Sequence, residues 1–227
     1  MCGDITISSI SKKLKNTCQL MRQSWLVVFI ALLMSLPVSE SLAGEVWVAN
    51  MKGANVQVID TGSNKVVKTI ATGAGAHNVT FSPDGKLAFI ANLGTNSITI
   101  IDTLSKEILA DVVTDTKAHD VAVSPDGKLA VACNVGAGNI TFIDVASRKA
   151  VHTMATGKKA ITAVFSYDGE TLYVVNAGAA NISVIDVKSK KITGTRRGAK
   201  GAMAIKPVNN WGQFWLTAPE DDKLLLL

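Results

Sequence analysis

Four positions spaced 42 residues apart, each directly after an alanine, carry the side chains with the clearest chemical potential in this sequence. They are His77, His119, Ile161 and Met203. A neutral imidazole nitrogen and a thioether sulfur are both ligands that haem iron takes in proteins. The series could therefore hold a cofactor, or its histidines could hydrogen-bond the neighbouring loops. The sequence leaves both alternatives open.

Four lysines stand close to this series in the chain. They are Lys117, Lys158, Lys159 and Lys200. An ammonium group makes strong, charge-assisted hydrogen bonds to carboxylates and other anions. These lysines are therefore candidate anion-binding residues around the same site. The alternative is that they are solvated side chains of surface loops.

The familiar catalytic and metal-binding motifs are absent from the sequence. It contains no HExxH, GxSxG or GxxxxGK[ST] motif and no pair of CxxC motifs, so those metal, hydrolase and P-loop classes lack support. A CxxCH haem-attachment motif is also absent. Cys133 is the only cysteine after residue 43, and its apolar neighbours predict a buried thiol without a disulfide partner in that part of the chain. We assign no catalytic residue and no metal ligand.

The composition argues against disorder and against a dedicated nucleic-acid binder. Hydrophobic residues make up 48% of the 227 residues, enough to bury a sizeable core. The net charge is +5, and it falls to +3 (19 basic against 16 acidic residues) without the first 43 residues. This bias is too weak to indicate nucleic-acid binding. Eighteen glycines and five prolines suit a strand-rich chain with many tight turns.

The first 43 residues have the pattern of a secretory signal peptide. Basic residues precede an apolar run at residues 26–36, and a polar stretch with the small residues Ser41 and Ala43 follows it. The apolar run is too short to cross a bilayer, which takes roughly 20 helical residues. We therefore predict cleavage after Ala43, a periplasmic or secreted protein, and no stable membrane span after cleavage. Met21 is an alternative start, and an uncleaved membrane anchor is the alternative to cleavage.

The rest of the chain repeats itself every 42 residues. In each repeat an asparagine ends one hydrophobic run and an aspartate ends the next. They are Asn50, Asn92, Asn134 and Asn176, and Asp60, Asp102, Asp144 and Asp186. A turn motif recurs at the same interval, as SPDG at 82–85 and 124–127 and as SYDG at 166–169. A fixed period of this length indicates a solenoid or a propeller.

Each repeat predicts four short antiparallel strands. In the second repeat, hydrophobic runs at 77–81, 86–92, 96–102 and 106–113 are separated by turn residues. The proline of SPDG presets the first turn position, and the glycine takes the left-handed one. Function rarely needs the same residue in every repeat, so we interpret the repeated Asn, Asp, Pro and Gly as structural. Four strands in about 40 residues are typical of a β-propeller blade, which makes the predicted fold class all-β.

These motifs resemble the YVTN-type β-propeller repeat, whose consensus runs approximately YVxN, SVID and SPDG. The matching segments are VWVAN, AFIAN, VACN and YVVN, with SITIID, SVIDV and SPDGKLA. The resemblance covers about residues 45–195 strongly and 196–227 weakly. It implies a propeller of usually seven blades. It does not single out a function, because the family includes surface proteins, periplasmic binding proteins and relatives of the cytochrome d1 haem domain.

Three functional hypotheses follow from the residues and the resemblance together. The first is an exported, non-catalytic β-propeller that binds a small ligand or a protein partner at the mouth of its central channel. The second is a haem-d1-like cofactor-binding or redox propeller with His77, His119 and Met203 as candidate ligands. Adjacent inner strands lie too close to place His77 and His119 on opposite faces of one haem, so at most one of them is an axial ligand. A lactonase-like hydrolase is the third, although its acidic and arginine pattern has no match here.

The predicted propeller is partial. The 184 residues from Gly44 to Leu227 hold about 4.4 repeats, whereas seven blades need about 294 residues. The first repeat begins with a second strand, and the last repeat lacks a fourth strand. We therefore predict that residues 44–227 form an open arc of blades, a truncated propeller rather than a ring. The exposed faces and edges of such an arc favour self-association.

Overall fold

The computed structural model describes residues 44–208 and 213–226. Contacts divide the chain into two units, Met1–Gly44 and Glu45–Leu227, of which the second contains nearly all of the described residues. The signal peptide predicted for residues 1–43, its cleavage site and the alternative start at Met21 lie outside the described residues. Among the described residues, no helix has the length and the apolar character needed to cross a membrane.

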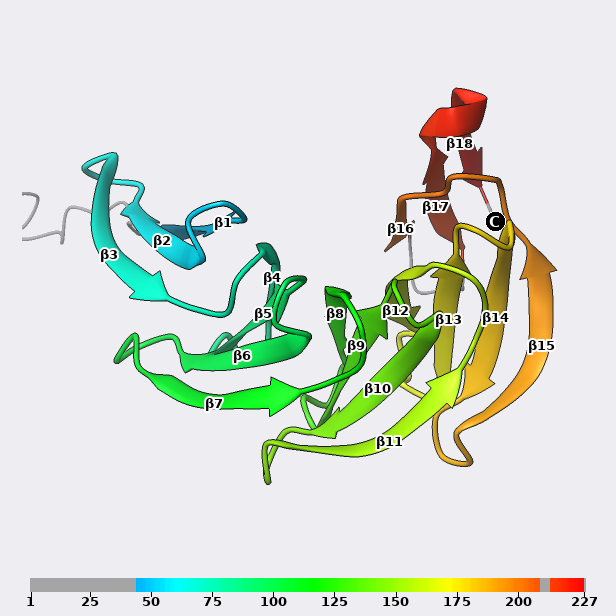
Figure 1. The fold of residues 1–227 in the computed structure, drawn as a ribbon, viewed down its shortest axis with the longest axis horizontal. Coiled ribbons are helices and arrows are strands. Elements are labelled where there is room, and N and C mark those ends of the chain that lie inside the picture. The colour runs from blue at the N-terminus through cyan, green and yellow to red at the C-terminus, as the bar shows by residue number, and fades with distance from the viewer. Residues whose placement is uncertain (1–43, 209–212, 227) are drawn as a thin grey trace, which may run out of the picture. The chain divides into compact units, whose positions relative to one another are not determined.

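The described residues form 18 β-strands in five antiparallel sheets, which we call blades 1 to 5 in chain order (Figure 1). Blade 1 has three strands, β1 (Glu45–Asn50), β2 (Asn55–Asp60) and β3 (Lys65–Ala71). Blade 2 has four, β4 (Ala76–Phe81), β5 (Leu87–Asn92), β6 (Ser97–Asp102) and β7 (Ile108–Val113). Blade 3 has β8 (Ala118–Val123), β9 (Leu129–Asn134), β10 (Asn139–Asp144) and β11 (Lys149–Ala155).

The last two blades follow the same order. Blade 4 has β12 (Ala160–Phe165), β13 (Thr171–Asn176), β14 (Asn181–Asp186) and β15 (Lys191–Arg197). Blade 5 has three strands, β16 (Ala204–Pro207), β17 (Phe214–Ala218) and β18 (Lys223–Leu226), with the short 3₁₀-helix η1 (Pro219–Asp221) between the last two. The prediction of four-stranded antiparallel blades is confirmed in blades 2 to 4.

The repeated turn motifs form hairpin turns, as predicted. In blade 2 the hydroxyl of Ser82 donates to Asp84 Oδ1 (2.7 Å), and the backbone N–H of Gly85 donates to the carbonyl of Ser82 (2.9 Å). Gly85 has a φ of +71°, which a glycine adopts without steric cost. The SPDG motif of blade 3 and the SYDG motif of blade 4 repeat these contacts. We call this end of the blades the SPDG end.

The repeated aspartates close a second set of turns at the same end. Asp144 Oδ1 accepts hydrogen bonds from the backbone N–H (2.8 Å) and from the hydroxyl (2.5 Å) of Ser147. These hydrogen bonds favour the carboxylate form, and they hold the pKa of Asp144 below its ordinary value of 3.8. Asp60 and Asp186 make the same pair of contacts to Ser63 and Ser189. Their role in the blade is therefore structural.

The hydrophobic core consists of clusters between neighbouring blades. Phe89 of β5 packs with Val121 and Ala130 of blade 3, and Val131, at the same place in the next repeat, packs in a cluster with Leu172 of blade 4. Each of blades 2 to 4 therefore buries one face against the sheet before it and the other against the sheet after it. Cys133 is fully buried in this core as a free thiol, as predicted, and burial raises its pKa.

The five sheets do not close into a ring (Figure 1). Strand β1 aligns with the second strand of the later blades, so the described residues of blade 1 include no innermost strand, and those of blade 5 include no fourth strand. In blades 2 to 5 the innermost strands β4, β8, β12 and β16 contact one another in chain order. The open arc of blades predicted from the repeat length is thus confirmed for the described residues. The innermost strands are the elements that position the candidate site.

Candidate functional site

The histidine series lies at a β-bulge in each innermost strand. The pairing register shifts between Ala76 and Asn78 in β4, and the same shift occurs in β8 and β12. His77, His119 and Ile161 are therefore the extra residues of three equivalent bulges. A bulge turns a side chain away from the direction that regular pleating would give it. We call this end of the blades, opposite the SPDG end, the histidine end.

The two histidines are anchored through the same nitrogen. Nδ1–H of His77 donates to the carbonyl of His119 (3.1 Å), and Nδ1–H of His119 donates to the carbonyl of Ile161 (3.0 Å). Their ring centroids are 4.1 Å apart, with the planes inclined at 39°. In the described part of the chain, Nε2 of neither ring has a hydrogen-bond partner, so each presents one free acceptor in its neutral form.

Burial and the nearby charge of His77 lower the pKa of His119, and the carbonyl of Ile161 and the carboxylate of Asp120 oppose this effect. A lowered pKa keeps the imidazole neutral near pH 7, the form that binds a metal. Because the two rings lie side by side, they cannot occupy opposite faces of one planar macrocycle. The two rings could therefore supply at most one ligand to such a group.

Met203 continues the series into blade 5. It directly precedes β16, and 48% of its surface is exposed. Its backbone N–H donates to the carbonyl of Thr217 (2.9 Å). In the repeat series, Ile161 of blade 4 comes between the two histidines and Met203. The structure therefore brings His77 and His119 together and records no contact between either of them and Met203.

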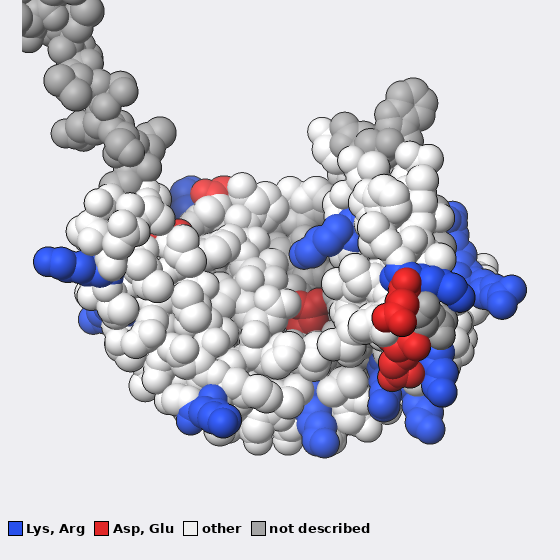
Figure 2. Space-filling model, turned by 90° about the horizontal axis from the view of Figure 1, so that it is seen from above, with Lys and Arg blue, Asp and Glu red and all other residues white. Residues whose placement is uncertain are grey.

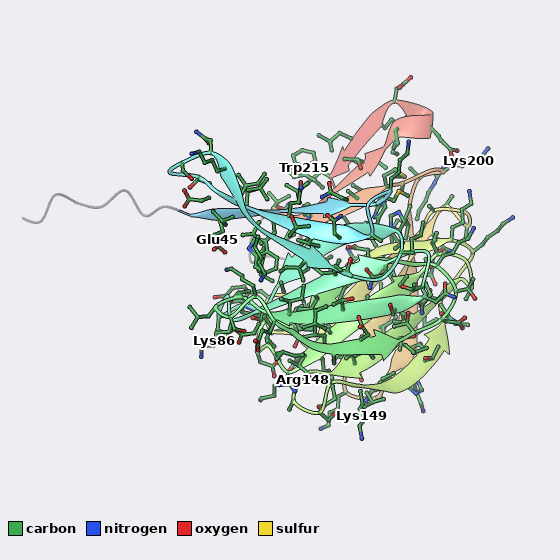
Figure 3. All side chains as sticks on the ribbon, turned by 60° about the vertical axis from the view of Figure 1, so that its left-hand side comes forward. Glu45, Lys86, Arg148, Lys149, Lys200 and Trp215 are labelled. Carbon is green, nitrogen blue, oxygen red and sulfur yellow. The ribbon has the colours of Figure 1, made fainter. Side chains whose placement is uncertain are left out.

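The four candidate lysines are all exposed at the histidine end. Lys117 and Lys159 have left-handed φ angles of +60° and +57°, at the repeat position where blades 2 and 5 have Gly75 and Gly201. In Figure 3, Lys200 and the SPDG-end residue Lys86 lie at opposite sides of the view. None of the four lysines forms an ion pair with a described residue. Their ammonium groups face solvent. This exposure is compatible with solvated loop side chains and with anion-binding residues.

A cavity of about 770 Å³ opens along the innermost strands of blades 2 to 5. We call it the inner-strand cavity. Figure 2 shows the molecule from above, hollowed between its blades, with acidic atoms inside the hollow. In blades 2 to 4 the lining begins at the residue after His77, His119 and Ile161, and in blade 5 it begins at Lys206. The lining residues are Asn78–Thr80, Asp120–Val123, Pro125, Thr162–Asp168, Thr171, Tyr173, Lys206–Val208 and Phe214. His77 and His119 are not among them.

Asp120 is the central polar residue of this cavity. Only 8% of its surface is exposed. Its Oδ1 accepts a hydrogen bond from the amide of Asn78 in blade 2, and its Oδ2 accepts one from the hydroxyl of Thr162 in blade 4 (2.6 Å). One carboxylate thus joins three blades. These three residues also stand 42 residues apart, directly after the histidine series.

The remaining cavity wall combines apolar and aromatic side chains. Val123, Val164 and Phe165 give apolar surface, and Tyr167 of the SYDG turn is 73% exposed at the SPDG end. The hydroxyl of Thr80 donates a hydrogen bond to the carbonyl of Val121 (2.8 Å), so it has no proton left to donate to a ligand. Apolar walls with a few polar groups are typical of small-molecule sites, and the volume lies within their usual range of about 300–1,000 Å³.

Asn78, Asp120 and Thr162 were not predicted as site residues from the sequence. The series reads Asn, Asp, Thr and Ala at 78, 120, 162 and 204, so no identity repeats to attract notice. A polar residue at the same place in three successive innermost strands was the available signal.

A second cavity lies at the SPDG end between blades 1 and 2, with a volume of about 380 Å³. Its charged groups neutralise one another, because Lys106 Nζ lies 2.5 Å from Glu45 Oε2. The same ammonium lies 5.1 Å from the centre of the Trp47 ring. This cavity therefore offers little unpaired polarity to a ligand.

Comparisons with known proteins agree with this geometry. Residues 43–168, more than half of the chain, match the family model described as YNCE-like β-propeller. No curated protein matches the chain. Hydrazine synthase from Kuenenia stuttgartiensis is a similar solved structure, with a TM-score of 0.68 and 20% identity over 81% of this chain and 58% of that chain.

The dihydro-haem d1 dehydrogenase NirN, solved in complex with DHE, is also similar. Its TM-score is 0.64, with 14% identity over 81% of this chain and 43% of that chain. Identities this low show the fold alone. The chain spans less than two thirds of the length of both structures.

Proposed function

The chain belongs to the YNCE-like β-propeller family, and on that premise we propose that it is an exported, non-catalytic propeller that binds a small ligand in the inner-strand cavity. Export rests on the basic flank, the short apolar run and the small residues before Gly44. Binding rests on the cavity itself, which four successive innermost strands line.

The observation that carries this proposal is the buried carboxylate at the centre of the cavity. Asp120 is 8% exposed and still lines the open space, held by Asn78 and Thr162. A cavity with apolar walls and a few fixed polar groups is the usual form of a small-molecule site. Its polar groups are held by hydrogen bonds before a ligand arrives, which reduces the entropic cost of binding.

A screen of small organic fragments by ligand-observed NMR tests the proposal. Val208, which is 42% exposed and lines the cavity, can be enlarged in a Val208→Trp variant to fill part of the space. Val113 on the outer strand β7 is 74% exposed, and Val113→Trp is the matched control. We expect fragments that bind the wild type and the control but bind Val208→Trp more weakly. Hits that bind both variants equally, or no hits at all, would reject the cavity as the site.

Haem binding at the histidine end is the second candidate function. It is supported by the free Nε2 atoms of His77 and His119, each held in place through Nδ1. When bound, haem would supply redox or small-gas chemistry, and the chain would supply one axial imidazole. An optical titration of the purified full chain with haemin tests this. We expect a Soret band at a 1:1 ratio that is lost in His77→Ala or His119→Ala; a titration without a defined end point would reject it.

A further inference from the structure

The inner-strand cavity holds a buried negative charge without a cationic partner. Asp120 is more than nine-tenths buried. Among the residues that the structure describes, no lysine, arginine or histidine forms an ion pair with it. Buried carboxylates are nearly always paired, because removing the charge from water is costly. The side-chain hydrogen bonds that Asp120 accepts in the described structure come from the neutral groups of Asn78 and Thr162.

The carboxylate also keeps unused hydrogen-bonding capacity. An ionised aspartate offers about four lone-pair positions. Each oxygen of Asp120 accepts one hydrogen bond from a neighbouring blade, which leaves lone pairs on both oxygens. Because Asp120 lines the cavity, a donor inside the cavity can reach these positions. The strongest such donor is a charged one.

The charges around the cavity favour a cation. The charged lining residues are Asp120, Asp168 and Lys206, so the lining carries a net charge of −1. Asp168 is exposed, and it already accepts the Ser166 hydroxyl (2.6 Å) and the backbone N–H of Glu170 (3.0 Å). The lowered pKa of His119 keeps this adjacent imidazole neutral near pH 7. Asp120 is therefore the carboxylate with the most to gain from a cationic partner.

We propose that the inner-strand cavity binds a small organic cation whose ammonium group pairs with Asp120 and whose apolar body packs on Val164 and Phe165. This inference rests on the proposed function and names the ligand class for the same cavity. The ligand carries a single positive charge, because a second ammonium group would meet Lys206 on the cavity wall. An aromatic or branched aliphatic amine has the required chemistry.

Isothermal titration of the full chain with two matched probes tests the ligand class. Phenethylamine is a cation at pH 7, and 2-phenylethanol has the same carbon skeleton with a neutral hydroxyl. We expect the amine to bind at least about ten-fold more tightly than the alcohol, since charge-assisted hydrogen bonds are roughly twice as strong as neutral ones. Equal binding of the two probes would overturn the cation proposal and leave the cavity as a binding site. Binding of neither probe would also overturn it.

Two variants locate the effect. Asp120→Asn keeps the shape of the side chain and removes its charge, so we expect the amine and the alcohol to bind within about three-fold of each other. Asp168→Asn changes the exposed carboxylate of the same cavity, and we expect it to keep the preference for the amine. A preference that survives Asp120→Asn and disappears in Asp168→Asn would contradict the assignment to Asp120. If Asp120→Asn does not fold, the two probes on the wild type and on Asp168→Asn still decide the question.

Discussion

The hydroxyl of Thr162 donates a hydrogen bond to Asp120 Oδ2 across the boundary between two blades (2.6 Å). The two residues stand 42 positions apart, at equivalent places in successive innermost strands. Thr162 is 8% exposed, as is Asp120. This contact holds the carboxylate at the cavity wall and links blade 3 to blade 4.

Removal of the Thr162 hydroxyl should therefore destabilise the protein. Thr162→Val keeps the side-chain shape but leaves Asp120 Oδ2 without its partner, and a buried unsatisfied acceptor costs about 1–3 kcal/mol. Thr195 on β15 is exposed and its hydroxyl makes no recorded hydrogen bond, so Thr195→Val should change the free energy of unfolding by less than about 0.5 kcal/mol. Urea unfolding of both variants measures the difference. Equal stability of Thr162→Val and the wild type would show that the hydrogen bond does not stabilise the fold.

The repeated aspartates should make stability fall in acid. The Ser147 hydroxyl, followed by its backbone N–H, lowers the pKa of Asp144 in the folded state below 3.8. The folded protein therefore binds a proton less readily than the unfolded chain. This contribution is fully present above the unfolded pKa and is lost as the pH falls through the folded pKa.

Ser147→Ala removes the larger of these two causes. We expect its free energy of unfolding to fall less steeply than that of the wild type as the pH drops below about 4. Thr195→Ala, which has no carboxylate partner, should keep the wild-type slope. Urea unfolding at a series of pH values between about 3 and 6 makes the comparison. Parallel curves for Ser147→Ala and the wild type would be inconsistent with this role of Ser147.

The outer face of blade 5 should mediate self-association. In blades 1 to 4, the aromatic or aliphatic residue equivalent to Trp215 packs in a cluster with the following blade, as Phe89 and Tyr173 do. Trp215 itself is 41% exposed (Figure 3), and Leu226, its pairing partner on β18, is 52% exposed. On blade 1 the exposed face is the one that, in the later blades, packs against the preceding blade. Val46 on this face is 48% exposed. Two copies can therefore pair blade 5 with blade 1.

Light scattering during size-exclusion chromatography measures this association. We expect the mass of the full chain to rise with concentration, and Trp215→Glu to remove that rise because it places a charge in an apolar contact. Val113→Glu, on the outer edge of blade 2, should behave as the wild type does. A wild type that stays monomeric at all concentrations would rule out this surface as an interface.

The repeated residues made most of the fold predictable. Asn92, Asp102 and Gly85 act within their own blade, where a fixed spacing in the sequence corresponds to a fixed place in a hairpin. Local turn chemistry of this kind can be read from residue types alone. For the same reason the strand boundaries, and the three strands described in each of blades 1 and 5, were predictable.

The candidate site was less predictable, because it depends on contacts between blades. The bulges at His77 and His119 are defined by the pairing partner, and the sequence does not show that a residue is unpaired. Asn78, Asp120 and Thr162 differ in type, so a search for repeated identities passes over them. Their hydrogen bonds exist only because neighbouring innermost strands pack side by side.

Chemical-shift mapping with phenethylamine tests whether a small organic cation binds at Asp120, because it reports where a ligand contacts the chain. Backbone amide spectra of the full chain are recorded with increasing amine. We expect the largest shifts at Asp120, Val123, Val164 and Phe165, on the innermost strands that line the cavity. Shifts confined to His77 and His119 at the histidine end, or to the outer strands β7 and β11, would contradict it.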